Sequence, residues 1–158
     1  MKKLIIIAAL IMAATISAKA QFFNGFEVGG SIQYANQDGK SNVGFDLRAT
    51  KRVATWASLR AVGTVNGTIR NGFDRYGTAA VGVSIDALPF YVFADYGLLV
   101  NPSAARKVGM AFDAGVGLQV EVCNGWHVVT ELAIDRVGSR NAWQSTPSVK
   151  AGVAYRFK

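Results

Sequence analysis

VGMAFDAGVGLQVEV, residues Val108 to Val122, alternates apolar residues with small or polar ones and has no interruption. A period of two sends successive side chains to opposite faces of a β-strand. The stretch is much longer than the roughly 5–6 residues of an average globular strand, whereas a tilted strand that crosses a bilayer needs about 9–11 residues in the hydrocarbon. It therefore predicts a long strand with one apolar and one polar face.

The N-terminus predicts a signal peptide. Two lysines precede an apolar segment at residues 4–16, and residues 18–20 match the A-x-A pattern that signal peptidase cuts. An uncleaved helical anchor is the weaker alternative, because the apolar segment is shorter than the roughly 20 residues of a membrane-spanning helix. Cleavage after Ala20 would leave one exported domain, residues 21–158, and remove residues 1–20.

Charge and cysteine content limit the classes of protein. The signal peptide contains three lysines, so 14 basic residues face 10 acidic ones after cleavage, and the net charge falls from +7 to +4. Cys123 is the only cysteine, which excludes an internal disulfide. Cys123 is either a small residue at a turn, or its thiol forms a disulfide with another molecule. Pro89, Pro102 and Pro147 fall at expected strand boundaries, where a missing N–H group does least harm.

Eight alternating segments are expected, and no helix. They cover residues 22–36, 42–51, 53–66, 75–87, 90–100, 108–122, 126–137 and 148–157. Tight reversals are expected at Lys51-Arg52, Leu88-Pro89 and Asn124-Gly125, and the longest loop at residues 138–146. Long connections thus alternate with tight ones, and together with the even strand number this is typical of a bacterial outer-membrane barrel whose longer loops face outside.

The charged residues indicate which face lines the interior. Most of the acidic residues fall on the polar faces with four cations: Glu27, Asp46, Asp86, Asp95, Asp113, Glu121, Glu131 and Asp135, with Arg48, Arg60, Lys150 and Arg156. The apolar faces carry aromatic residues near the strand ends, as in the aromatic girdles of membrane barrels. We therefore expect Met110, Phe112, Val116 and Leu118 to face lipid, and the lumen to be filled by side chains. A soluble lipocalin-like barrel with the opposite orientation is the alternative.

The Asn124-Gly125 hairpin predicts the pairing of charged residues. The expected register is Val122 with Trp126, Glu121 with His127 and Asp113 with Asp135. Counting residues away from the last long loop in the same way sets Asp135 opposite Lys150. Asp95 is expected at that level, with Arg60 reaching across the lumen. A second tier nearer the periplasm would combine Glu27, Asp86 and Glu121 with Arg48, Arg156 and His127. These groups are expected to form a structural ion network, because like charges face to face need intervening cations.

Over residues 21–158 the chain resembles the small eight-stranded outer-membrane proteins of the OmpA/OmpX-like, porin-type barrel family. The last strand ends VKAGVAYRF, which is similar to the C-terminal signal read by the barrel-assembly machinery; Val153, Tyr155 and Phe157 would present it, although Lys158 follows the aromatic residue that is commonly last in the family. The resemblance implies an all-β, eight-stranded antiparallel up-and-down transmembrane β-barrel with a polar, plugged interior. It also implies an integral protein of the Gram-negative outer membrane.

Residues that could carry catalysis are sparse. His127 is the only histidine, and its expected position beside Glu121 at the periplasmic rim offers neither a nucleophile nor a set of metal ligands. We therefore expect no enzymatic activity, no cofactor, no metal site and no nucleic-acid partner.

The expected outer connections are basic. The candidate contacts to lipopolysaccharide are Lys40, Arg70, Arg75, Arg106, Lys107 and Arg140. Arg136 has the parity of an apolar face and is expected at the same rim, where lysine and arginine side chains bind phosphate well. A solvated set of loops is the alternative. The expected role is structural or surface interaction; the alternatives are a narrow channel for small solutes and a barrel subunit of a larger envelope complex.

Overall fold

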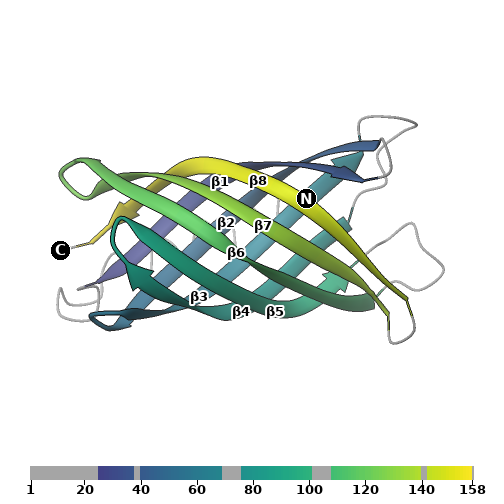
Figure 1. The fold of residues 1–158 in the computed structure, drawn as a ribbon, viewed down its shortest axis with the longest axis horizontal. Coiled ribbons are helices and arrows are strands. Elements are labelled where there is room, and N and C mark those ends of the chain that lie inside the picture. The colour runs from purple at the N-terminus through teal and green to yellow at the C-terminus, as the bar shows by residue number, and fades with distance from the viewer. Residues whose placement is uncertain (1–24, 38–39, 69–75, 101–107, 140–141, 158) are drawn as a thin grey trace, which may run out of the picture.

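Eight strands follow from the period-two alternation. The computed structural model describes residues 25–37, 40–68, 76–100, 108–139 and 142–157. The strands are β1 (Phe26–Gln37), β2 (Lys40–Ala54), β3 (Ala57–Thr68), β4 (Tyr76–Ala87), β5 (Phe90–Val100), β6 (Val108–Cys123), β7 (Trp126–Ser139) and β8 (Ala142–Arg156). Each strand pairs antiparallel with the next, and β8 returns to β1, so that the sheet closes into a barrel (Figure 1). No helix in the described ranges is long and apolar enough to cross a membrane.

The barrel has a shear of ten residues, which can be followed through the Cα partners. The path from β1 runs through Ala35, Ser148, Ala133, Gly115, Phe93, Ser84, Ser58 and Arg52. The Arg52 N–H donates to Gly25 O at 3.0 Å, so the path returns to the first strand ten residues before Ala35. Shear and strand tilt are linked, and a tilt of about 40° is usual for such barrels. A line drawn across the strands from β1 toward β5 therefore climbs from the end with the tight turns toward the other end.

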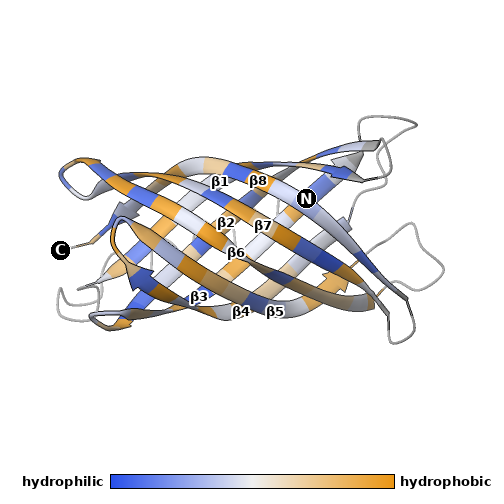
Figure 2. Ribbon diagram, in the orientation of Figure 1, coloured by the Kyte–Doolittle hydropathy of each residue, from blue (hydrophilic) through white to orange (hydrophobic). Residues whose placement is uncertain are grey.

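The expected fold and orientation are confirmed. Leu47 and Leu132 are 53% and 55% exposed on the outside, whereas Asp95, Glu131 and Lys150 are only 1–2% exposed on the inside. Figure 2 shows the resulting alternation of apolar and polar residues along the strands. Apolar residues outside and charges inside are the arrangement of a transmembrane barrel and the reverse of a soluble one.

The three tight turns lie at the end where β1 begins and β8 ends. The Asn124-Gly125 turn is confirmed, with positive φ at both residues (35° and 86°), as a type I′ hairpin requires. The chain also turns at Leu88-Pro89, as expected. The expected reversal at Lys51-Arg52 is wrong: the β2–β3 ladder continues to Arg52 and Ala54, and the chain turns at Thr55-Trp56.

The last hairpin is longer than expected. β8 begins at Ala142, six residues before the expected start, because residues 142–147 pair with residues 134–139 of β7. The loop expected at 138–146 is therefore mostly strand. Pro147 lies inside β8, directly beyond the last β1–β8 pair of Ala35 and Ser148, so its missing N–H leaves no gap in that ladder.

Aromatic side chains gather at the end with the tight turns. Tyr155 lies 5.2 Å from Trp126 and 5.1 Å from Phe157, and Phe157 lies 6.2 Å from Phe26, measured between ring centroids. A band of aromatic side chains at one height along the barrel axis is typical of a membrane–water interface.

Candidate functional site

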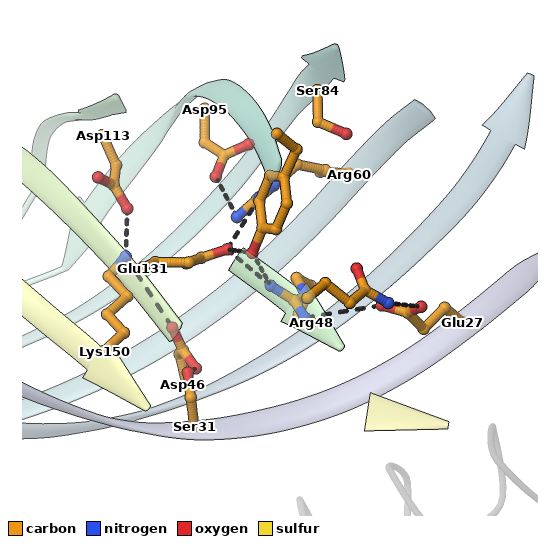
Figure 3. Close-up of polar contacts among 12 residues, drawn as sticks. Glu27, Ser31, Asp46, Arg48, Arg60, Ser84, Asp95, Asp113, Glu131 and Lys150 are labelled. Carbon is orange, nitrogen blue, oxygen red and sulfur yellow. Dashed lines mark hydrogen bonds and ion pairs between the residues drawn. The ribbon is translucent and has the colours of Figure 1, made fainter. Parts of the chain in front are cut away.

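Glu131 of β7 is the centre of a charged layer across the lumen. Its Oε1 accepts hydrogen bonds from Arg48 Nη1 at 2.6 Å, Arg60 Nη1 at 3.0 Å and Tyr91 Oη at 2.6 Å (Figure 3). The donors come from β2, β3 and β5, so a single carboxylate joins four strands. Charge-assisted hydrogen bonds of this kind are the strong ones, and the low dielectric of the interior strengthens them further.

Arg60 extends this layer along β5. Its Nη2 lies 3.2 Å from Asp95 Oδ2, and its guanidinium carbon lies 4.0 Å from the centroid of the Phe93 ring. The same carbon lies 5.8 Å from the Tyr91 ring centroid. These are favourable cation–π distances, so the ring faces and the guanidinium fill the middle of the lumen together.

Lys150 organises a second group of charges toward the end opposite the tight turns. Its Nζ pairs with Asp113 and lies 3.9 Å from both Asp46 Oδ2 and Asp135 Oδ1. Asp46 also accepts a hydrogen bond from the Ser31 hydroxyl. One buried cation is thus shared by three aspartates from three different strands.

The register expected for this group is correct in one place and wrong in another. Asp113 lies opposite Asp135, as predicted, and Asp95, which was expected at the same level, lies opposite Asp113. Lys150, however, lies opposite Glu131 and not opposite Asp135, a difference of four residues that follows from the longer β7–β8 hairpin.

Glu27 is the centre of a third group, near the tight turns. It lies 3.6 Å from Arg48 Nη2 and 3.0 Å from Arg156 Nη2, and Gln119 Nε2 donates to it at 2.5 Å. The structure thus brings Glu27 together with both arginines assigned to this tier.

The other three residues assigned to this tier have different hydrogen-bond partners. Asp86 accepts hydrogen bonds from the Ser58 and Ser84 hydroxyls, at 2.7 and 3.0 Å. Glu121 accepts one from the Gly125 N–H at 2.9 Å, and His127 Nδ1 lies 2.9 Å from Gly125 O.

Glu121 lies opposite His127, as expected, but the predicted pairing of Val122 with Trp126 is wrong. A bulge between Glu121 and Cys123 sets Cys123 opposite Trp126.

Two small cavities flank the Glu131 layer. The one nearer the tight turns measures about 20 Å³ and is lined in part by Arg48, Asp86 and Arg156. The other measures about 30 Å³ and is lined in part by Asp113 and Asp135. Since a water molecule needs at least about 10–15 Å³ of such volume, each cavity has room for a water molecule or two. The side chains of the lumen can bind water and form ion pairs, but they leave no space for a hydrated solute at these positions.

Sequence reasoning left the aromatic part of the layer out of the ion network. Tyr91 and Phe93 share the parity of Asp95, which assigns them to the polar face, but alternation alone does not show that their rings pack against the charged groups. Gly117 lies opposite Tyr91, and a Cβ atom on Gly117 would meet the Tyr91 ring at 2.1 Å. The aromatic ring therefore depends on a glycine directly across the strand pair.

The outer basic residues are described only in part. Arg70, Arg75, Arg106, Lys107 and Arg140 lie outside the described residues, as does the side chain of Lys40. Arg136 is exposed on the lipid-facing side of β7, opposite Phe112 and Ser145, and its Nε donates to Ser145 Oγ at 2.9 Å.

Two further sequence features lie near the tight turns. Val153, of the expected assembly signal, is exposed on the outer face, and Tyr155 and Phe157 belong to the aromatic cluster. Cys123 is exposed beside the β6–β7 turn. Within the described ranges no group of three or more His, Cys, Asp or Glu side chains is placed to hold a metal ion.

The fold, the apolar outer wall and the filled lumen define a small eight-stranded transmembrane β-barrel. The chain is similar to Neisserial surface protein A, with a TM-score of 0.61 and 15% identity over 85% of this chain and 98% of that one. It is also similar to Ail, the attachment invasion locus protein of Yersinia pestis (TM-score 0.51, 16% identity, 84% of this chain and 96% of that one). A de novo designed transmembrane β-barrel gives a TM-score of 0.50 at 18% identity, over 84% of this chain and 96% of that one. Neither a family model nor a curated protein matches the sequence.

Proposed function

We propose that the protein is an integral outer-membrane barrel with a structural and surface-interaction role, and that it neither catalyses a reaction nor conducts solutes. The observation that carries this proposal is the combination of an apolar outer wall with a lumen closed by the Glu131 layer. The tight turns face the periplasm and the opposite end faces outside, as in bacterial barrels of this kind. Residues 1–20 direct export, and the mature protein begins at Gln21.

The closed lumen supports a structural role over the narrow-channel alternative. Glu131, Arg48, Arg60 and Tyr91 meet in the middle of the barrel, and the neighbouring cavities have room for only a few water molecules. The folded protein is expected to give no persistent conductance in planar bilayers. Persistent single-channel steps at neutral pH would contradict this part of the proposal and favour a solute channel.

The outward position of Arg136 supports contact with lipopolysaccharide. An arginine on the lipid-facing wall is unfavourable near the bilayer midplane and tolerated near an interface, and Arg136 lies toward the end opposite the tight turns. A phosphate of lipopolysaccharide at that level offers the bidentate anionic partner that a guanidinium prefers. The basic residues of the outer connections would add to the same anion-binding rim.

The amount of lipopolysaccharide that stays bound to the protein during purification from native outer membranes tests this proposed contact. We expect Arg136→Gln to lower the amount retained, and Arg70→Gln, Arg106→Gln and Arg140→Gln together to lower it further. Lys51→Gln is the matched control, because it removes an outward-facing cation at the opposite end of the barrel. Unaltered lipopolysaccharide retention in all the arginine variants would refute the proposed contact. A stoichiometric protein partner in a pull-down would instead favour the alternative that the barrel is a subunit of an envelope complex.

A further inference from the structure

The outer wall of the barrel contains a groove of about 680 Å³ that crosses β2 to β5. Two adjacent rows of cross-strand neighbours form it. In one row Gly63 and Ala79 lie between Leu47 and Leu98, and in the next row Ala49 lies opposite Ala61. Small side chains therefore form the floor, and leucines form the two ends of the first row.

Gly63 shows that the protein itself leaves the groove unfilled. A Cβ atom built on Gly63 would have no heavy atom within 4 Å, in contrast to Gly82, where it would lie 2.1 Å from Ala94 O. The hydrocarbon core of a membrane contains no water that could fill such a space. An apolar group from the bilayer must therefore occupy it, since atoms that line a void lose their dispersion contacts.

The shape and slope of the groove fit a lipid chain. Because of the shear, rows that run from β2 to β5 climb obliquely from the end with the tight turns toward the opposite end. A single acyl chain rising from the periplasmic surface of the membrane would follow this direction. Close approach to a small-residue floor is also how apolar groups gain packing energy in a membrane, where no hydrophobic driving force acts.

A cation lies just below the groove, on the side of the tight turns. Lys51 is on the same outward-facing side of β2 as Ala49, one row closer to the tight turns, opposite Phe26 and Leu59. The β2–β3 turn with the exposed Trp56 follows directly, and tryptophan is enriched at membrane interfaces. Lys51 therefore lies at headgroup level in the periplasmic leaflet, where a lysine attracts anionic lipid.

We propose that this groove binds one acyl chain of an anionic glycerophospholipid from the periplasmic leaflet, with the headgroup phosphate paired to the Lys51 ammonium. The inference rests on the membrane orientation given above and adds a lipid site at the end of the barrel opposite the lipopolysaccharide rim. It commits to a phospholipid source, since lipopolysaccharide would meet the barrel at the Arg136 end.

Native mass spectrometry of the folded full-length mature barrel tests the site, with phosphatidylglycerol and phosphatidylcholine of identical acyl chains as probes. The wild-type barrel should retain phosphatidylglycerol in preference to phosphatidylcholine by about fivefold, the effect of one lysine near an anionic headgroup. Gly63→Leu and, separately, Ala79→Leu should fill the groove and lower retention of both lipids severalfold. Lys51→Gln should remove the preference between the headgroups and leave phosphatidylcholine retention unchanged.

A matched control separates this site from general lipid contact. Ala151→Leu adds the same volume to an exposed position on the outer face of β8, away from the groove, and should retain phosphatidylglycerol as the wild type does. Equal retention in the wild type and both groove variants would overturn the proposal, as would an equal loss in Ala151→Leu or a Lys51→Gln variant that keeps the preference.

Heat-modifiable gel mobility shows whether each variant is folded. A wild-type chain that fails to fold into lipid would refute the membrane barrel itself, whereas folded variants with identical lipid retention would refute only the groove.

Discussion

Replacing Glu131 with glutamine tests whether the charged layer stabilises the barrel. The substitution keeps the shape of the side chain but removes the charge that Arg48 and Arg60 share, and both guanidinium groups stay inside the lumen. Removing one partner of a buried ion pair generally costs about 3–5 kcal/mol. The glutamine oxygen can still accept a hydrogen bond from Tyr91 or an arginine, so the lower end of that range, about 3 kcal/mol, is expected.

Urea unfolding in phospholipid vesicles, followed by tryptophan fluorescence, measures this loss as a change in the free energy of unfolding. Asp86→Asn is the matched control, because it removes one negative charge from a carboxylate whose hydrogen bonds come from the Ser58 and Ser84 hydroxyls. That variant should lose about 1 kcal/mol or less. Equal losses in Glu131→Gln and Asp86→Asn, or a loss below about 1 kcal/mol in both, would refute the idea that Glu131 holds the layer together.

Three further outcomes follow from the same structure and use the same unfolding measurement. Lys150→Met removes the cation shared by three aspartates and should cost about 3–5 kcal/mol; unchanged or higher stability would contradict the pairing. Leu132→Arg places a charge on the lipid-facing wall near the middle of the barrel and should cost about 2–4 kcal/mol, more than Leu118→Arg nearer the tight turns; the reverse ranking would contradict the assigned depth. Gly82→Ala should lose about 1–3 kcal/mol because its Cβ atom would meet the neighbouring backbone, whereas Gly63→Ala should be close to neutral; equal effects would argue against the close packing at Gly82.

Strand faces and tight turns were the most predictable features. Period two assigns every residue of a strand to one of two sides, and this information lies within the strand itself. The Asn-Gly pair likewise located the β6–β7 turn, because positive φ at both central residues defines a two-residue hairpin. The Asp113–Asp135 pair also depends on the bulge between Glu121 and Cys123, since the ladder continued from Cys123 and Trp126 without that bulge would set Asp113 opposite Arg136.

Strand ends were less predictable. The reversal after β2 and the start of β8 were misplaced because residues 52–54 and 142–147 pair with neighbours even though they carry weak or mixed alternation. Pairing in a closed barrel extends a strand wherever a partner is available, and the partner belongs to another part of the chain.

The sequence by itself determined that the barrel is inside out, with apolar residues toward lipid and charges in the lumen, because this pattern depends only on alternation. Which charges meet was decided by tertiary structure. Glu131 is 83 residues from Arg48 and 71 from Arg60, and the three meet only because closure and shear bring strands from opposite sides of the ring to one level. The outer groove has the same origin, since Ala49, Gly63 and Ala79 become neighbours only through the register of three strands.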